Sequence, residues 1–473
     1  MLIVGNGHVI TRDAKNQYIP DGAVAMDGMK ICRVGQTAEI RRAFPDADFI
    51  DAKGGVIMPA FINTHEHIYS AMARGLNING YAPKGFLDIL DGLWWNIDRH
   101  LTNDLTYLSA METYVECIKN GVTTVFDHHA SFGEIKDSLF AIGQAAQELG
   151  VRSCLCYEVS DRDGQDKARQ AVLENEAWIR HAQADTTDML AGMMGMHAQF
   201  TISDETMALA AEHKPDGVGY HIHVAEGIED LQDCLKKHGK RIIDRLYDWN
   251  ILGPKTLLGH CIHVNPHEMD LIKETDTMVV HNPESNMGNA CGCPPTMDMV
   301  HRGILTGLGT DGYTHDMIES YKVANILHKH HLCDATAAWT EVPQMLFYNN
   351  AVIANRYFKA PLGVLAEGAA ADVIVMDYIA PTPMNEENIN GHILFGMNGH
   401  DVVTTIANAF ADYGLIFGAF GLPELGVQGA AIATCISSWL GPILLLIFSA
   451  IEKNLLVGPV KELLAFNLKQ VGE

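Results

Sequence analysis

The chain has 473 residues, of which 33 are basic and 58 acidic, so its formal net charge is −25 at pH 7. A protein with this excess of negative charge repels phosphate backbones, which excludes a role in coating nucleic acid. Hydrophobic residues make up 48% of the chain and charged residues 19%, and these values exclude a disordered or collagen-like protein. The length accommodates an α/β barrel together with a smaller domain, and the acidic balance favours a small neutral or cationic ligand.

The ten cysteines follow no regular disulfide framework, which is typical of reduced thiols inside the cell. The first residues of the chain contain no basic stretch followed by an apolar one, so we expect no export signal there. Together these features predict a cytoplasmic protein.

Residues 1–56 contain short apolar runs separated by Gly and Asp turns, a pattern that predicts strands of an antiparallel sheet. From residue 55 to about residue 313, short apolar runs alternate with longer helical patterns, as in a parallel barrel with helices between its strands. The predicted barrel strands are Gly55–Ile62, Thr123–Phe126, Ser153–Cys156, Met193–Met196, Tyr220–Val224, Thr256–Leu258, Thr277–Val280 and Ile304–Leu308.

A ninth segment, Ala371–Asp377, alternates apolar and polar residues like the opening strands. We expect it to join the N-terminal strands in a small β-sandwich domain beside a (β/α)8, TIM-like barrel. The expected division of the chain is residues 1–56 and 361–406 for the small domain, residues 57–360 for the barrel and residues 407–473 for an apolar helical tail.

Histidines and acidic residues gather at the carboxyl ends of the predicted barrel strands, where active sites lie in this fold. His65 and His67 are two residues apart on an extended chain, so both side chains project to one side and can bind one metal ion. His223 would be a third ligand, with Glu226 beside the metal. Asp311, between two glycines, is a candidate fourth ligand. The alternative is that each is a hydrogen-bonded core or loop residue without a shared site.

Three imidazoles and a carboxylate with an open position describe a hydrolytic metal centre, in which a bound water loses a proton near neutral pH and attacks an electrophilic carbon. This chemistry also needs a proton carrier. Glu226 is the candidate carboxylate for that role.

Four separated motifs resemble those of the amidohydrolase superfamily. They are Met58–His67 (MPAFINTHEH), His223–Glu226 (HVAE), His281–Met287 (HNPESNM) and Gly309–Gly312 (GTDG). Within the superfamily the chain is similar to the branch of cytosine, guanine and triazine deaminases and chlorohydrolases, and most similar to the SsnA-type aminohydrolases. The resemblance covers residues 1–405.

The resemblance implies one divalent metal ion, Zn²⁺ with Fe²⁺ as the alternative, whose ligands would be His65, His67, His223 and Asp311. It implies three catalytic residues: Glu226 carries protons, His260 orients the nucleophile and Asp311 accepts a proton. In the implied reaction, a metal-activated hydroxide attacks an amino-bearing carbon of a small heterocycle and ammonia is released. A homodimer is compatible with the resemblance.

The substrate contacts are less well defined by the sequence. The resemblance implies that His197 contacts the substrate, and this histidine stands where binuclear relatives carry a bridging lysine, so one metal ion is expected. Residues 69–99 form a long segment in which Arg74 and Trp95 could close over a planar ring. The alternative is that the tryptophan is a core residue of a helix. Asn286 could contact the ligand or shape its loop.

The resemblance stops near residue 405, which would leave the second part of the small domain truncated. Residues 407–473 resemble a fragment of a multidrug and toxin extrusion (MATE) transporter. Residues 427–451 contain no charged side chain and are long enough to cross a bilayer, so any membrane contact is expected there. The alternative function is therefore an inactive fusion remnant, or a membrane-associated protein with a damaged hydrolase domain.

Overall fold

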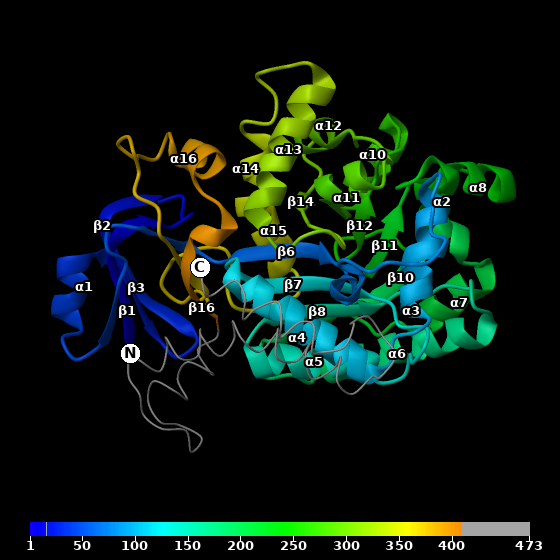
Figure 1. The fold of residues 1–473 in the computed structure, drawn as a ribbon, viewed down its shortest axis with the longest axis horizontal. Helices are drawn as coiled ribbons and strands as arrows, with labels where there is room; N and C mark the ends of the chain where they lie inside the picture. The colour runs from blue at the N-terminus through cyan, green and yellow to red at the C-terminus, as the bar shows by residue number, and fades with distance from the viewer. Residues whose placement is uncertain (16, 408–473) are drawn as a thin grey trace, which may run out of the picture. The chain divides into compact units, whose positions relative to one another are not determined.

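The computed structural model describes residues 1–15 and 17–407, all of which belong to one compact unit. The N-terminal strands and two later strands form a seven-stranded sheet (Figure 1). Its strands are β1 (Leu2–Ile10), β2 (Tyr18–Asp27), β3 (Lys30–Gln36), β4 (Asp48–Asp51), β5 (Val56–Pro59), β15 (Val373–Met376) and β16 (Val402–Ile406). Segments far apart in the sequence therefore share one sheet.

The long strand β1 connects the two halves of this sheet. Its first residues pair with β4 and its later residues pair with β5, in both cases in parallel. Its other edge pairs with β2 in an antiparallel arrangement. The hydrogen bonds thus join all seven strands into one sheet, whereas the predicted β-sandwich has two separate sheets.

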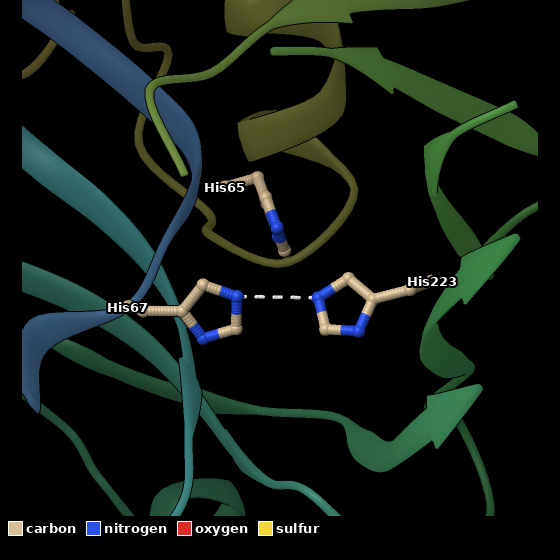
Figure 2. A group of neighbouring side chains, drawn as sticks. All are labelled: His65, His67 and His223. Atoms are coloured by element: carbon tan, nitrogen blue, oxygen red, sulfur yellow. Dashed lines mark hydrogen bonds between the residues drawn. The ribbon is translucent and has the colours of Figure 1, made fainter. Parts of the chain in front are cut away.

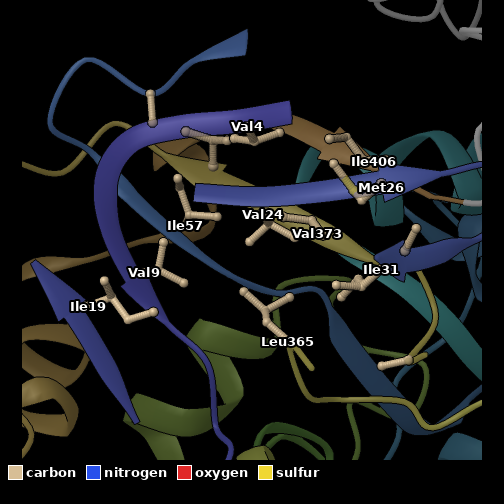
Figure 3. Close-up of a cluster of buried hydrophobic side chains, with 14 residues drawn as sticks. Val4, Val9, Ile19, Val24, Met26, Ile31, Ile57, Leu365, Val373 and Ile406 are labelled. Carbon is tan, nitrogen blue, oxygen red and sulfur yellow. The ribbon is translucent and has the colours of Figure 1, made fainter. Parts of the chain in front are cut away.

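A core of buried apolar side chains holds the early and late segments of this sheet together (Figure 3). β-Branched residues predominate in it, which suits the half-buried surface of a pleated sheet. Members of the core include Val4, Val9, Val24, Ile57, Leu365, Val373 and Ile406. The boundaries of the small domain and the barrel, at residues 56 and 360, stay a prediction.

In the described part of the chain, eight strand positions form the barrel, and the fourth position is divided between two short strands. The strands are β6 (Phe61–Glu66), β7 (Val122–His129), β8 (Arg152–Tyr157), β9 (Leu190–Gly192), β10 (Met194–Ala198), β11 (Tyr220–Val224), β12 (Leu257–His260), β13 (Met278–His281) and β14 (Thr306–Leu308). A bridge between Val159 and Met196 joins the two parallel sheets, and a bridge between Glu66 and Asp311 closes the ring. The predicted α/β barrel is confirmed.

The sequence predicts a single first barrel strand over Gly55–Ile62, and this prediction is wrong. The structure divides the run at Ala60 between β5, in the seven-stranded sheet, and β6, in the barrel. The N–H of Ala60 donates to the carbonyl of Asp372 at 3.0 Å and so still belongs to the first sheet. Both pieces are fully buried, and for this reason the hydrophobic pattern contains no sign of the break.

Helices cover the outside of the barrel, and in Figure 1 α4, α5 and α6 lie along β7 and β8. The barrel helices are α4 (Asn103–Lys119), α5 (Ser138–Leu149), α6 (Gln165–Gln183), η3 (Gln199–Thr201), α7 (Asp204–His213), α8 (Ile228–His238), α9 (Ile242–Asp248), α10 (Pro266–Glu274), α11 (Pro283–Gly288), α12 (Thr296–His301), α13 (Met317–Leu332), α14 (Glu341–Gln344), η4 (Met345–Asn349) and α15 (Asn350–Asn355). The helices outside the barrel are α1 (Thr37–Ala43), α16 (Ile389–Gly396) and η5 (Gly399–Asp401).

The segment between β6 and α4 consists of short helical pieces. They are η1 (Ile68–Ala73), α2 (Phe86–Ile89), the π-helical η2 (Leu90–Trp94) and α3 (Trp95–Asp98). A π-helical turn widens the helix locally and occurs often at functional sites. This segment is called the cover segment below and comprises residues 68–98.

Two expectations concern the cysteines and the tail. The cysteines of the described residues are all free thiols. Among the helices of residues 1–15 and 17–407, none combines the length and the apolar character that a bilayer crossing requires. The transporter-like tail and its residues 427–451 lie outside the described residues, apart from Ala407.

Candidate metal centre and active site

A chain of hydrogen bonds fixes the orientation of His65 on β6. The thiol of Cys156 donates to the carbonyl of Asp127, so its sulfur is free to accept from Nδ1 of His221 at 3.7 Å. Nε2 of His221 then accepts from Nδ1 of His65 at 2.9 Å. This tautomer leaves Nε2 of His65 without a hydrogen and free to bind a metal ion.

His67 is oriented in the same way by the backbone. Its Nδ1 donates to the carbonyl of His128 at 2.5 Å, so Nε2 is the nitrogen that can face a metal ion. This nitrogen lies 3.2 Å from Nε2 of His223, which extends from β11. Figure 2 shows the rings of His67 and His223 facing each other, with the ring of His65 directed into the space between them.

Asp311 brings a carboxylate to the three imidazoles from the loop after β14. Its Oδ1 lies 3.0 Å from Nε2 of His67 and 3.6 Å from Nε2 of His65. Ser285 donates to its Oδ2 at 2.5 Å, and the N–H of Gly312 donates to Oδ1 at 2.9 Å. The structure therefore brings together all four residues that the sequence predicts as ligands.

These residues fit a divalent metal ion. The ligating nitrogens of His65, His67 and His223 lie within 4.8 Å of one another, and Nε2 of His65 has no hydrogen-bond partner within the described residues. Burial lowers the pKa of His65 to about 3 and holds the pKa of His223 well below its usual range, so both rings are neutral ligands. Burial lowers the pKa of His67, but the adjacent carboxylate of Asp311 outweighs this effect and raises the pKa to about 9, so metal binding would displace a proton from this ring. Three imidazoles in their neutral form and a carboxylate are a donor set that suits zinc.

Glu226 and His260 lie beside this donor set. Nε2 of His260 is 3.6 Å from Oε2 of Glu226 and 3.6 Å from Oδ2 of Asp311. The amide of Asn289 donates to Oε1 of Glu226 at 3.2 Å. Burial raises the pKa of Glu226, so the carboxyl group takes up a proton more readily than an exposed glutamate. The position and the pKa suit a group that carries protons, although the catalytic roles stay predictions.

The predicted substrate contacts fall into two groups. The ring of His197 lies 5.6 Å from that of His223, so His197 borders a predicted metal ligand, and the ring of Trp95 lies 5.8 Å from that of His197. Arg74 instead contacts the ring of His315 and lies 3.6 Å from Glu112. No hydrogen bond or ion pair joins Arg74 to a predicted metal ligand in the described residues.

Asn286 is buried and bonded to other side chains of the site. Its oxygen accepts from Nδ1 of His260 at 2.7 Å, and its amide nitrogen lies 3.4 Å from Nδ1 of His281. Both ends of the amide thus have protein partners. The side chain of Asn286 therefore positions two histidines, and its contact with a substrate stays a prediction.

The cover segment places an apolar cluster beside the site. Its Phe86 and Leu90 pack with Ile262 and Cys291, and Trp94, Trp95 and Phe200 border the same cluster. The buried Nε1 of Trp95 has no hydrogen-bond partner within residues 1–15 and 17–407. The tryptophan packs in an apolar cluster and reaches His197, and its closure over a substrate ring stays a prediction.

Several further residues lie near the metal ligands, and the sequence reasoning assigned no ligand or catalytic role to any of them. His128 and His221 lie with ring centres 4.4 Å from His223 and 4.9 Å from His65, respectively. Glu158 lies close to His197 and follows the predicted strand Ser153–Cys156 within two residues. A charged residue at a strand's carboxyl end was the signal that could have identified Glu158.

Comparison with known proteins agrees with this geometry. Residues 56–410 match the amidohydrolase family, and residues 22–47 match a bacterial imidazolonepropionase-like composite domain. A 5'-deoxyadenosine deaminase of Methanosarcina mazei is 31% identical over 416 residues, which cover 86% of this chain and 91% of that protein. A 5-methylthioadenosine/S-adenosylhomocysteine deaminase of Thermococcus sibiricus is 29% identical, with 86% of this chain and 92% of that protein covered.

Solved structures show the same fold. A zinc-bound adenosine deaminase from Xanthomonas campestris has a TM-score of 0.75 at 19% identity and covers 93% of this chain and 97% of its own. The guanine deaminase of E. coli has a TM-score of 0.73 at 18% identity, with 86% and 98% covered. The inactive remnant considered as an alternative is not favoured, because the family match spans the barrel and the ligands converge. The chain belongs to the amidohydrolase family and is a metal-dependent aminohydrolase that acts on carbon–nitrogen bonds.

Proposed function

We propose that the chain hydrolytically removes the amino group of a small molecule that contains an amino-substituted purine ring. The placement of His260 carries this proposal, because its Nε2 lies 3.6 Å from a carboxylate oxygen of both Glu226 and Asp311. The predicted proton carrier and a predicted metal ligand thereby meet at one histidine. The names of the two deaminase relatives support a purine ring as the substrate.

Four residues would hold the metal ion, namely His65, His67, His223 and Asp311. When bound, the ion supplies Lewis acidity, which makes water a competent nucleophile near neutral pH. The protein's own contribution is orientation, because the bonds of His65 to His221 and of His67 to a carbonyl direct both Nε2 atoms inward.

Glu226 would carry the protons of the reaction. It accepts one proton from the attacking water and delivers it to a ring nitrogen. Asp311 accepts the second proton of that water, which reaches the amino group through Glu226, so that neutral ammonia leaves. The raised pKa of Glu226 makes the protonated form accessible, and Asn289 holds its other oxygen. His260 would orient the nucleophile through Nε2, and the apolar cluster of the cover segment would exclude bulk water.

Ammonia release from adenine, guanine and 5'-deoxyadenosine by the zinc-loaded chain tests the proposal. We expect at least one of these purines to be deaminated. The substitution Glu226→Gln should lower kcat by about 10²- to 10⁴-fold, since a positioned acid–base group contributes about that much. Glu205→Gln, a matched change on the exposed face of α7, should leave the rate unchanged. A metal-loaded chain that releases ammonia from none of the purines would exclude the proposed function.

A further inference from the structure

Glu158, directly after β8, directs its carboxylate toward the metal ligands. A carboxylate oxygen of this residue lies within 4.8 Å of ligating nitrogens of His67 and His128. A carboxylate oxygen of Glu158 also lies within 4.8 Å of ligating nitrogens of His197 and His223. The carboxylate is therefore within reach of the space in which a substrate would meet the metal centre.

The neighbours of this carboxylate lie too far away for normal hydrogen bonds. Its Oε2 is 3.4 Å from Nδ1 of His128, and its Oε1 is 3.8 Å from Nε2 of His197 and 3.9 Å from Arg162. Normal N–H···O bonds measure about 2.7–3.2 Å between heavy atoms. A carboxylate can accept several hydrogen bonds, and a buried one is costly without them. Glu158 thus retains capacity to accept from a ligand.

These neighbours are held in place by other partners and cannot easily close on Glu158. Arg162 bonds to Asp98 at 2.5 Å, and its guanidinium packs over the rings of Trp95 and Phe132. A similar restraint acts on His128, whose Nε2 lies 3.1 Å from two backbone carbonyls. The carboxylate consequently lies near positive and polar groups, and these groups leave its capacity to accept hydrogen bonds largely unused.

Glu158 is also distinct from the proton carrier. Glu226 lies beside His260 and Asp311, whereas Glu158 lies beside His197 and His128. Glu226 accepts one hydrogen bond from Asn289 and lies beside His260. A second carboxylate that takes no part in the proposed proton transfers is available for substrate recognition.

We propose that Glu158 is a specificity-determining residue that accepts a hydrogen bond from a neutral N–H or O–H donor of the substrate, other than the amino group that leaves. This inference rests on the proposed function and narrows its substrate class to aminated heterocycles with a second donor. The donor is either a second ring amino group or a ribose hydroxyl, which share this chemistry. Glu158 would then reject analogues without the donor, because its carboxylate would be left unpaired.

Two pairs of compounds test the proposal with the zinc-loaded chain. 2,6-Diaminopurine and adenine differ by one ring amino group, and adenosine and adenine differ by the ribose. The wild-type chain should prefer the donor-bearing member of one pair in kcat/KM. In Glu158→Gln that preference should fall by about 10- to 100-fold, as expected for a hydrogen bond to a charged group. If the preference is lost in the first pair, the donor to Glu158 is the ring amino group. If it is lost in the second pair, the donor is a ribose hydroxyl.

The matched control is Glu174→Gln, which changes another buried glutamate that accepts hydrogen bonds from the N–H groups of Asp137 and Leu139, away from the metal ligands. Its substrate preference should equal that of the wild type. If Glu158→Gln does not fold, Glu158→Asp keeps the charge and shortens the reach, and it should lose the same preference. Unchanged preferences in both pairs would overturn the proposal.

Two further measurements separate the failures. Metal content distinguishes recognition from ligation, because a Glu158→Gln chain that no longer retains zinc would identify Glu158 as a ligand and overturn the proposal. If the wild type deaminates no purine, the proposed function fails, and calorimetric binding of the same compounds then decides. A binding preference that disappears in Glu158→Gln supports the role of Glu158, and an unchanged binding preference overturns it.

Discussion

The side-chain oxygen of Asn286 lies 2.7 Å from Nδ1 of His260. An amide oxygen can only accept, so His260 must donate its Nδ1 hydrogen there. In the neutral ring this tautomer leaves Nε2 as a free lone pair 3.6 Å from both Glu226 and Asp311. Asn286 therefore sets the nitrogen that His260 presents to the reaction.

Replacement of Asn286 by Leu should lower kcat by about 10- to 100-fold, the usual cost of losing a partner that orients a catalytic or ligating histidine. Asn286→Asp keeps an acceptor for His260 and should therefore lower kcat less than Asn286→Leu. Steady-state kinetics across pH, with metal content measured in parallel, checks this expectation. A rise in KM at unchanged kcat would instead support the substrate contact predicted from the sequence.

The bond between His221 and His65 predicts an effect on metal affinity. His221→Phe removes the acceptor that fixes Nδ1 of His65 at 2.9 Å. We expect zinc affinity to fall by about 10- to 100-fold, as measured by competition with a chelator. His267→Phe, on the exposed side of α10, is the control and should bind zinc like the wild type. Equal affinity in both variants would refute the orienting role of His221.

A buried ion pair links β8 to the residue before β15. Arg152 lies 2.5 Å from Asp372, and both side chains are nearly inaccessible to solvent. Asp372→Ala would leave the buried guanidinium without its carboxylate, which should cost about 3–5 kcal/mol in the free energy of unfolding. Urea denaturation measures this cost. Asp298→Ala, which breaks an exposed pair with Arg302, should cost less than about 1 kcal/mol. Similar losses in the two variants would contradict the argument.

Glu174 predicts a pH dependence of stability. Burial raises its pKa from 4.5 to about 7 in the folded chain, although two backbone N–H groups oppose the shift. The folded state therefore binds the proton more tightly than the unfolded state, and this contribution is complete below pH 4.5 and lost as pH rises through 7. The free energy of unfolding should fall by up to about 3 kcal/mol across that range. In Glu174→Gln, the free energy of unfolding, measured by denaturation at each pH, should change less over this pH range. An unchanged pH dependence would show that other groups cause it.

The metal ligands could be predicted from the sequence because they follow a simple geometric rule. Side chains at the carboxyl ends of parallel strands meet at one end of a barrel, so His65, His67, His223 and Asp311 converge although 246 positions separate the first from the last. Each also stands in a recognisable motif. Spacing along the chain was by itself sufficient only to pair His65 with His67.

Other features depend on contacts that leave no pattern in the sequence. The break at Ala60 lies within a continuous apolar run, and both sides of it are buried, so hydrophobicity cannot locate it. Arg74 follows the ligand pair in sequence but contacts His315 and Glu112. Asn286 in α11 accepts a hydrogen bond from His260 at the end of β12, and the sequence contains no sign of this contact either. Tertiary packing decides such contacts.

Elemental analysis of the purified, monodisperse chain tests the central claim most directly, with His65→Ala as the variant and His267→Ala, on the exposed side of α10, as the control. The claim is that three histidines and Asp311 bind one divalent ion. The account predicts about one zinc ion per chain in the wild type and in the control, and none in His65→Ala. A wild-type chain without metal, or a His65→Ala chain that retains a full equivalent, would contradict it.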